Sequence, residues 1–227
     1  TVAGDFTTSG GLLGASCLTL NGSSEYAAQT SATTWGFGGV FSVEMWIKST
    51  ADESAVLFDM YNGSNNNDRI NIFNNGGTSI CFKCYNSSGS VFTMVSNTVN
   101  PDDGKWHHVA CTSSGSAQTI HYDGKLIGSF SNTIARTTNT NDPSMRLYIG
   151  CDKDVAYFWD GSIDELRMFS DVRTEAEIRA DMFQGGTLAN SGNLTARHSF
   201  NEGTSTAIDN SQGTAGRDLV LSDAGGW

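Results

Sequence analysis

The amino-acid sequence predicts an all-β fold, a sandwich of two antiparallel sheets with one short C-terminal helix. Short runs of alternating apolar and polar residues recur about every 8–12 residues between turn signals, which is the spacing of strands in β-sandwiches. The composition suits strands and loops, with 26 Gly and only 2 Pro among 227 residues. A chain of this length is sufficient for one large β domain with its own core.

The first strand region is expected at residues 17–28. Leu18 and Leu20 alternate with polar residues there, and Asn21-Gly22 is a turn signal. Residues 41–48 form the clearest strand of the sequence. Its apolar face carries Phe41, Val43, Met45 and Ile47, and its polar face carries Ser42, Glu44, Trp46 and Lys48.

Trp46 is a large aromatic residue on the polar face of this strand, and two interpretations of it are open. The ring could be a platform for the C–H surface of a sugar. The commoner role of such a residue is structural, with the ring packed under the second sheet.

Four further strands are expected at residues 55–61, 69–73, 79–85 and 91–95. Between the first two, residues 62–68 read NGSNNND, a loop with several side-chain oxygens. This loop is either only solvated, or it is a rim loop that contacts a sugar or a metal, because binding residues gather on loops held by a rigid scaffold. In the second case the binding residues are Asn65, Asn66, Asn67 and Asp68.

A hairpin is expected next, with strands at residues 105–112 and 118–123 and a small-residue turn at 113–117. Asp123-Gly124 is a further turn signal, since both central positions of the favoured two-residue turn need a positive φ. Trp106 is expected to be mostly buried, and residues 129–144 are expected to form a loop.

Strands are also expected at residues 146–151 and 158–169. In the second of these, Ile163 and Phe169 should share one face, and Asp164, Leu166 and Met168 the other. The apolar positions expected in the core are Phe41, Val43, Met45, Ile47, Val109, Ile120, Ile149 and Ile163.

One helix is expected at residues 174–183. Thr174 and Glu177 have the spacing of a capping box, and Gly185-Gly186 supplies a stop signal. Beyond it, residues 188–227 contain strand-like runs at 195–200 and 218–221. A strand pair without its own sheet is marginal in water, so this tail should add to a sheet edge, either in its own domain (residues 1–187) or in a neighbouring copy. The second alternative would allow self-association.

Several of these segments resemble the laminin G-like or pentraxin-like module of the concanavalin A-like lectin/glucanase superfamily. The most specific are WHHVA at 106–110 with YDGK at 122–125, and FWDGSIDELRMF at 158–169. The strands at 17–28, 41–48 and 146–151 and the helix also match that pattern. The resemblance implies a jelly-roll sandwich.

The tail departs from the family order. Residues 194–221 resemble the stretch that usually precedes the opening strand of this family, including FNEG at 200–203. Either the tail is the start of a further repeat in a tandem array, or it folds back as a permuted strand.

The resemblance implies a non-catalytic extracellular module that binds glycans or matrix components. The alternative is a structural repeat unit of a large extracellular or cell-surface assembly, in contact with neighbouring domains. It also implies a structural calcium ion, held by Asp164 and by oxygens from residues 21–25, including Asn21 and Glu25. Asn21 stands where the family usually has Asp.

A glycan-active enzyme on the same fold is the third alternative, and the sequence gives it little support. Glycosidases of this fold place carboxylates on one strand as E-x-D-x-x-E. The nearest grouping is Asp160, Asp164 and Glu165, which does not have this spacing. No grouping of a nucleophile, His and Asp can be argued from the sequence.

The formal net charge of −11 argues against nucleic acid and anionic lipid as partners, because both need a positive footprint. There is no run of about 18 apolar residues, so membrane insertion is not expected.

Five cysteines suggest disulfides or buried thiols, and Cys81-x-x-Cys84 lies in an expected strand, which disfavours a zinc site. Four N-x-S/T sequons fit a secreted or cell-surface glycoprotein: Asn21, Asn62, Asn86 and Asn193.

Overall fold

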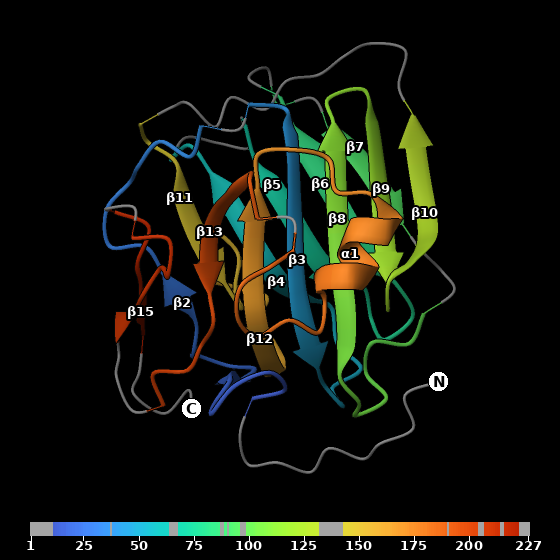
Figure 1. Cartoon of the computed structure of the whole chain (residues 1–227). Helices are drawn as coiled ribbons and strands as arrows, with labels where there is room; N and C mark the ends of the chain where they lie inside the picture. The colour runs from blue at the N-terminus through green and yellow to red at the C-terminus, as the bar shows by residue number, and fades with distance from the viewer. Residues whose placement is uncertain are drawn as a thin grey trace.

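The computed structural model consists of two antiparallel sheets packed face to face, with one short helix on the outside of the first sheet (Figure 1). It describes residues 11–36, 38–63, 68–86, 89, 91–95, 99–131, 143–189, 191–203, 207–213 and 216–222, with the backbone alone described for 91–95. The predicted all-β sandwich with a jelly-roll architecture is confirmed.

The first sheet has the order β1-β12-β3-β8-β9-β10, and β13 also pairs with β12. Its strands are β1 (Leu18–Asn21), β3 (Val40–Lys48), β8 (His107–Ser114), β9 (Ala117–Tyr122), β10 (Lys125–Ser131), β12 (Asp160–Phe169) and β13 (Leu194–His198).

The second sheet has the order β14-β15-β2-β11-β4-β5-β6-β7. Its strands are β2 (Ala27–Ala28), β4 (Ala55–Tyr61), β5 (Ile70–Asn74), β6 (Ile80–Tyr85), β7 (Val91–Val95), β11 (Arg146–Ile149), β14 (Ala207–Ile208) and β15 (Leu219–Leu221).

The core lies between the two sheets, and the predicted core positions are correct. All eight apolar positions expected in the core are fully buried. Most of Trp106 is buried, as expected, although it is not fully enclosed. Trp106 directly precedes β8, which begins at His107.

The face assignment within β12 was wrong, because the strand contains a β-bulge. Glu165 has a positive φ of 51°, and the β12–β3 register shifts between Asp164 and Arg167. One extra residue reverses the alternation after the bulge. Leu166 and Met168 therefore join Ile163 in the core, whereas Phe169 lies on the outer face under Arg173.

The structure also lengthens the hairpin region. β8 continues to Ser114 and β9 starts at Ala117, so only two residues of the expected turn at 113–117 lie outside strands. β10 occupies Lys125–Ser131, the start of the region expected to be a loop. Residues 132–142 lie outside the described residues.

Helix α1 (Glu175–Asp181) lies across the outer face of the first sheet (Figure 1). Thr174 is its N-cap and forms the predicted capping box with Glu177. The helix ends at Asp181, before the Gly185-Gly186 stop signal. The Glu175 carboxylate accepts the N–H of Leu126, which fixes the helix next to the β9–β10 turn.

The tail contributes strands to both sheets. β13 pairs with the C-terminal half of β12, and β15 lies between β2 and β14. Leu219 is fully buried and Leu221 is nearly so, and both belong to the core between the sheets. The last described residues of the chain are thus part of the sandwich.

The five cysteines are free thiols, and all except Cys17 are buried. The buried-thiol alternative is therefore correct for four of them, and the disulfide alternative is not. Burial raises the pKa of Cys81, and the pKa of Cys84 well above the usual range of a thiol. Cys84 belongs to the core and Cys81 does not, as expected for strand residues three apart.

Candidate functional site

The outer face of the first sheet carries a buried polar cluster under helix α1. Trp46 is 4% exposed, and its indole N–H donates to the carbonyl of Met182 at 2.8 Å. Its ring contacts His108 and Phe183. The structural interpretation of Trp46 is therefore the correct one, with the helix segment rather than the second sheet as its cover, and no ring face is left for a sugar.

The same cluster holds charged side chains in ion pairs. Arg173 donates to Glu44 and to Asp181, and all three are buried. Burial raises the pKa of Glu44 to about 7, although the neighbouring arginines lower it. Burial also lowers the pKa of His108 to about 3. These groups hold α1 on the sheet and are closed to a ligand.

The ligand set predicted for calcium is not brought together. The β1–β12 register pairs Asn21 with Asp160 and Leu18 with Ile163. Asn21 is thus four residues along the strand from Asp164, roughly 13 Å at the rise of a β-strand. The Asn21 side-chain oxygen instead accepts the backbone N–H groups of the turn that follows it, including that of Glu25.

Asp164 is fully buried, and its Oδ2 accepts the N–H of Leu13 at 3.2 Å. Burial raises the pKa of this carboxyl to about 7. Within the described part of the chain, no three His, Cys, Asp or Glu side chains lie close enough together to hold a metal ion. Calcium binding itself stays a prediction.

The predicted rim loop falls partly outside the described residues. Asn65, Asn66 and Asn67 lie outside the described residues. Asp68 is 3% exposed, has a φ of 52°, and accepts a hydrogen bond from the amide of Asn62. The loop follows Tyr61, the last residue of β4.

The sequon residues occupy different surroundings. Asn21 and Asn193 are exposed, and Asn62 and Asn86 are partly buried. The amide of Asn193 donates to Asp171 at 2.8 Å. Glycosylation at these positions stays a prediction.

The three carboxylates nearest to a glycosidase pattern do not face a common cleft. Asp160 is exposed at the start of β12, whereas Asp164 is buried beneath residues 11–13. Glu165 is buried and accepts hydrogen bonds from two arginines, Arg167 and Arg197. An acid and a nucleophile that act on one bond must both reach it, and these side chains do not.

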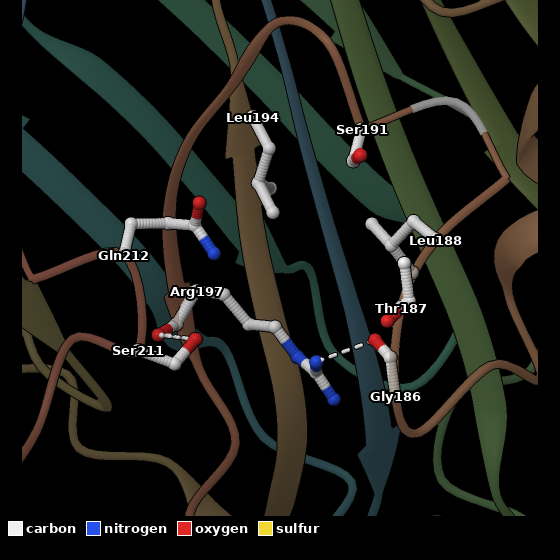
Figure 2. Close-up of a pocket in the computed structure, with 8 residues that line it drawn as sticks. All are labelled: Gly186, Thr187, Leu188, Ser191, Leu194, Arg197, Ser211 and Gln212. Carbon is white, nitrogen blue, oxygen red and sulfur yellow. Dashed lines mark hydrogen bonds between the residues drawn. The ribbon is translucent and has the colours of Figure 1, made fainter.

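A pocket of about 380 Å³ lies beside β13 (Figure 2). Its lining residues are Gly186, Thr187, Leu188, Ser191, Leu194, Arg197, Ser211 and Gln212. Arg197 reaches across it and donates to the carbonyl of Gly186 at 2.7 Å (Figure 2). Its other donors bind Glu165 and the carbonyl of Gly185. The guanidinium therefore stabilises the loop around Gly185 and Gly186, and its donors are already used within the protein.

The outer face of the second sheet carries a row of four partly exposed aromatic rings, which we call the aromatic row: Phe158, Tyr26, Tyr148 and Tyr61. Successive ring centroids are 6.4, 6.2 and 5.9 Å apart. Within the described residues the one helix lies on the other sheet, so no helix covers this row.

Strand geometry places these rings on one face. Tyr148 of β11 lies between the core residues Leu147 and Ile149, so its side chain points away from the core. Tyr61 follows the core residue Met60 in β4, which pairs with β11. Tyr26 directly precedes Ala27 of β2, on the other side of β11.

The row rests on a buried ion pair. Asp59 is fully buried and accepts two hydrogen bonds from Arg69, at 2.7 and 2.8 Å. The N–H of Lys153 donates to the same carboxylate at 2.7 Å. Tyr148 is opposite Asp59 in the β4–β11 register. This network holds the strands under the rings in one arrangement.

A strained loop borders the row. Val155 and Tyr157 have positive φ values of 55° and 54°, which is rare for β-branched or bulky residues. Asp152 fixes the loop by accepting the N–H groups of Asp154 and Ala156 at 3.0 Å. Tyr157 is 64% exposed and directly precedes Phe158.

Sequence reasoning missed the aromatic row. Its signal was present, because Tyr61 and Tyr148 occupy outward positions of strands whose neighbours are apolar, as Trp46 does. What the sequence did not contain was the pairing of β11 with β4 and β2, which joins residues from distant segments into one row.

Among solved structures, a heptameric SAP-like pentraxin from Limulus polyphemus has 13% identity and a TM-score of 0.60, covering 90% of this chain and 93% of that one. The CBM40 of the Ruminococcus gnavus IT-sialidase has 15% identity and a TM-score of 0.55, covering 71% and 95%. Domains LG4-5 of the mouse laminin alpha1 chain have 18% identity and a TM-score of 0.54, covering 67% and 40%.

This chain therefore spans less than half of the laminin domain pair. At these identities the likeness shows the fold alone. No curated protein sequence matches the chain. Within the described residues, no helix has the length and apolar character that crossing a membrane requires.

A laminin G family model, described as the concanavalin A-like lectin/glucanases superfamily, matches residues 21–179. This range is more than half of the chain and includes both motifs that carried the resemblance in the sequence. The chain belongs to the concanavalin A-like lectin/glucanases superfamily.

Proposed function

We propose that this chain is a non-catalytic, extracellular saccharide-binding module, and that its ligand lies along the aromatic row. The observation that carries the proposal is the row itself, four neighbouring rings on a sheet face that no helix covers in the described part of the chain. The carbohydrate-binding neighbours of the fold support it.

The chemistry of the row suits a saccharide. Tyrosine combines an apolar ring, which contacts sugar C–H groups, with a hydroxyl that exchanges hydrogen bonds with sugar hydroxyls. The rings of Tyr61 and Tyr148 are neighbours, with centroids 5.9 Å apart, so the row offers two hydroxyls beside each other. The ring spacing is close to the length of one sugar unit, so the row favours several consecutive units of a chain.

The scaffold makes such a site rigid before binding. Two of the four rings lie on strands, Tyr61 on β4 and Tyr148 on β11. Asp59 of β4 is held by Arg69 and by the backbone N–H of Lys153, which follows β11. Side chains held by packing lose little freedom when a ligand binds, which favours affinity.

A second candidate is contact with a neighbouring protein domain, and strand β10 favours it. Among the described strands, β10 lies at one edge of the first sheet, and it exposes Leu126 (50%) and Phe130 (37%). Exposed apolar edge strands are sites of strand pairing between chains. If the protein stays monomeric at high concentration and binds a saccharide, that result would favour the saccharide-binding function over domain contact.

The proposal is tested with a glycan array, followed by calorimetric titration of the best glycan with and without a chelator. Tyr148→Ala and Tyr61→Ala should each weaken binding about tenfold or more, a loss of about 1.4 kcal/mol. Tyr148→Phe, which keeps the ring, should retain most of the affinity.

The matched control is Phe130→Ala, an exposed aromatic residue on the other sheet, which should bind like the wild type. Melting curves establish that each variant is folded. Equal binding by wild type and both tyrosine variants would contradict the proposed site. A change in binding with the chelator would support the predicted calcium.

A further inference from the structure

We propose that the saccharide bound by the aromatic row carries a carboxylate, and that Arg146 recognises it. This inference rests on the proposed function. Arg146 begins β11 and is exposed. It is directly opposite Tyr61 in the β4–β11 register and two residues before Tyr148, so all three side chains lie on the outer face.

The other cations on this face are engaged within the protein. Arg69 is in bidentate contact with Asp59, and Lys153 contacts Asp154 at 2.9 Å. The Lys83 ammonium lies 4.4 Å from the centre of the Phe73 ring. Within the described residues no carboxylate or carbonyl pairs with the Arg146 guanidinium, although the chain has 24 acidic residues.

The electrostatics at Tyr61 agree with this placement. Burial and the neighbouring Tyr148 hydroxyl raise the pKa of Tyr61 to about 12, and the charge of Arg146 counteracts that rise. The guanidinium is thus close enough to act on groups at the Tyr61 end of the row. A ligand carboxylate lying against Tyr61 would be within the same range.

Arginine suits this task because its planar fork donates two parallel hydrogen bonds to a carboxylate. Arg197 shows the contrast, since its donors are already used by Glu165 and by loop carbonyls. Because the net charge of the chain is −11, an acidic saccharide is disfavoured over most of the surface. Its binding therefore requires a local cation, and Arg146 supplies one at the row.

The test compares two pairs of probes that differ in charge: oligogalacturonate against its methyl ester, and sialyllactose against lactose. Wild-type protein should bind the acidic member of at least one pair about tenfold more tightly, the range of a hydrogen-bonded charge pair. Arg146→Gln should remove that preference and leave affinity for the neutral member unchanged. Arg146→Lys should restore part of it.

Arg179→Gln is the matched control, because Arg179 is an exposed arginine of α1 on the other sheet and its loss changes the net charge equally. Equal effects of the two substitutions would overturn the inference, as would a wild-type preference for both neutral probes.

The two proposals fail in different ways. If Tyr148→Ala weakens binding of both members of a pair and Arg146→Gln changes neither, the row binds saccharide but Arg146 does not recognise a carboxylate. The further inference is then overturned and the proposed function stands. If Tyr148→Ala changes neither, or the wild type binds no member of either pair, both proposals are overturned for these saccharides.

Discussion

At the scale of single residues, an aromatic side chain on the outward face of a strand is buried in one place of this fold and partly exposed in another. Trp46 and Tyr148 are both aromatic side chains on the outward face of a strand. Trp46 is covered by the segment after α1 and is 4% exposed, whereas Tyr148 stays partly exposed among other rings. The strand pattern fixes only which way a side chain points. What covers it is decided by segments more than 100 residues away.

His107 is a residue whose contribution to stability should depend on pH. Its Nδ1 is 2.9 Å from Asp123 and its Nε2 is 3.0 Å from Asp103. Burial lowers the pKa of His107, but the hydrogen bonds with both carboxylates outweigh it and the pKa is raised overall. The same contacts, with those from Lys105, lower the pKa of Asp103 to about 2 against the effect of burial.

The folded-state pKa of His107 is above its unfolded value of about 6.5. The stabilisation is therefore complete below about pH 6.5 and is lost as the pH rises through the folded-state pKa. We predict that the melting temperature of His107→Gln is clearly below that of the wild type in mild acid, and that the gap narrows as the pH rises. Melting curves over this range check it, and a constant gap would contradict the ion-pair account.

At the scale of elements, local signals were sufficient where the residues act on their neighbours in sequence. The capping box of α1 and most strand positions followed from such signals. The bulge at Glu165 could not be predicted from such signals, because glutamate has no preference for a positive φ. Its conformation is held by distant partners, with Arg197 donating to its carboxylate. The face assignment of β12 was wrong for this reason.

The capping box should contribute measurably to the docking of α1. The hydroxyl of Thr174 accepts the N–H of Glu177, and the N–H of Thr174 donates to the Glu177 carboxylate at 2.8 Å. Thr174→Ala should lower the free energy of unfolding by about 1 kcal/mol. Denaturant titration measures it, and the tryptophan fluorescence, to which Trp46 contributes, should shift toward that of a solvent-exposed indole if α1 loosens.

Val172→Ala, an exposed position just before the cap, is the control and should change stability by less than about 0.5 kcal/mol. If Thr174→Ala is no more destabilising than this control, the cap does not determine the position of the helix.

The tail strands offer a matched test of their place in the sandwich. Leu219 of β15 is fully buried, and its neighbour Val220 is 38% exposed. Leu219→Ala should lower the free energy of unfolding by about 2–5 kcal/mol because it leaves a cavity in the core. Val220→Ala should cost much less, on the order of 0.5 kcal/mol.

Denaturant titration of both variants decides between the two interpretations of the tail. Similar small effects would mean that β15 is not packed in its own domain and would leave pairing with another copy as the explanation. Deletion of residues 188–227 should then also be harmless, whereas this structure predicts a large loss of stability.

At the scale of the whole molecule, the sandwich and its core were predictable from alternation and turn signals. The eight buried core positions show this, because each lies in a strand whose inward face is apolar over several residues. The site was not predictable in the same way. Trp46, the candidate sugar-binding residue, and Asp164, the candidate calcium ligand, are both buried. The aromatic row instead joins residues of β4 and β11 with residues that directly precede β2 and β12.

The two outer faces of the sandwich therefore differ in kind. The first sheet is closed by α1, by the segment after it and by residues 11–13 near Asp164. The second sheet has no helix over the row within the described residues. The central claim is that this open face, and not the closed one, binds saccharide.

A crystal structure with the best-binding oligosaccharide from the glycan array tests that claim most directly. The account predicts sugar rings against Tyr61 and Tyr148 on the outer face of the second sheet. A saccharide bound instead in the pocket beside Arg197 or under a displaced α1 would contradict it.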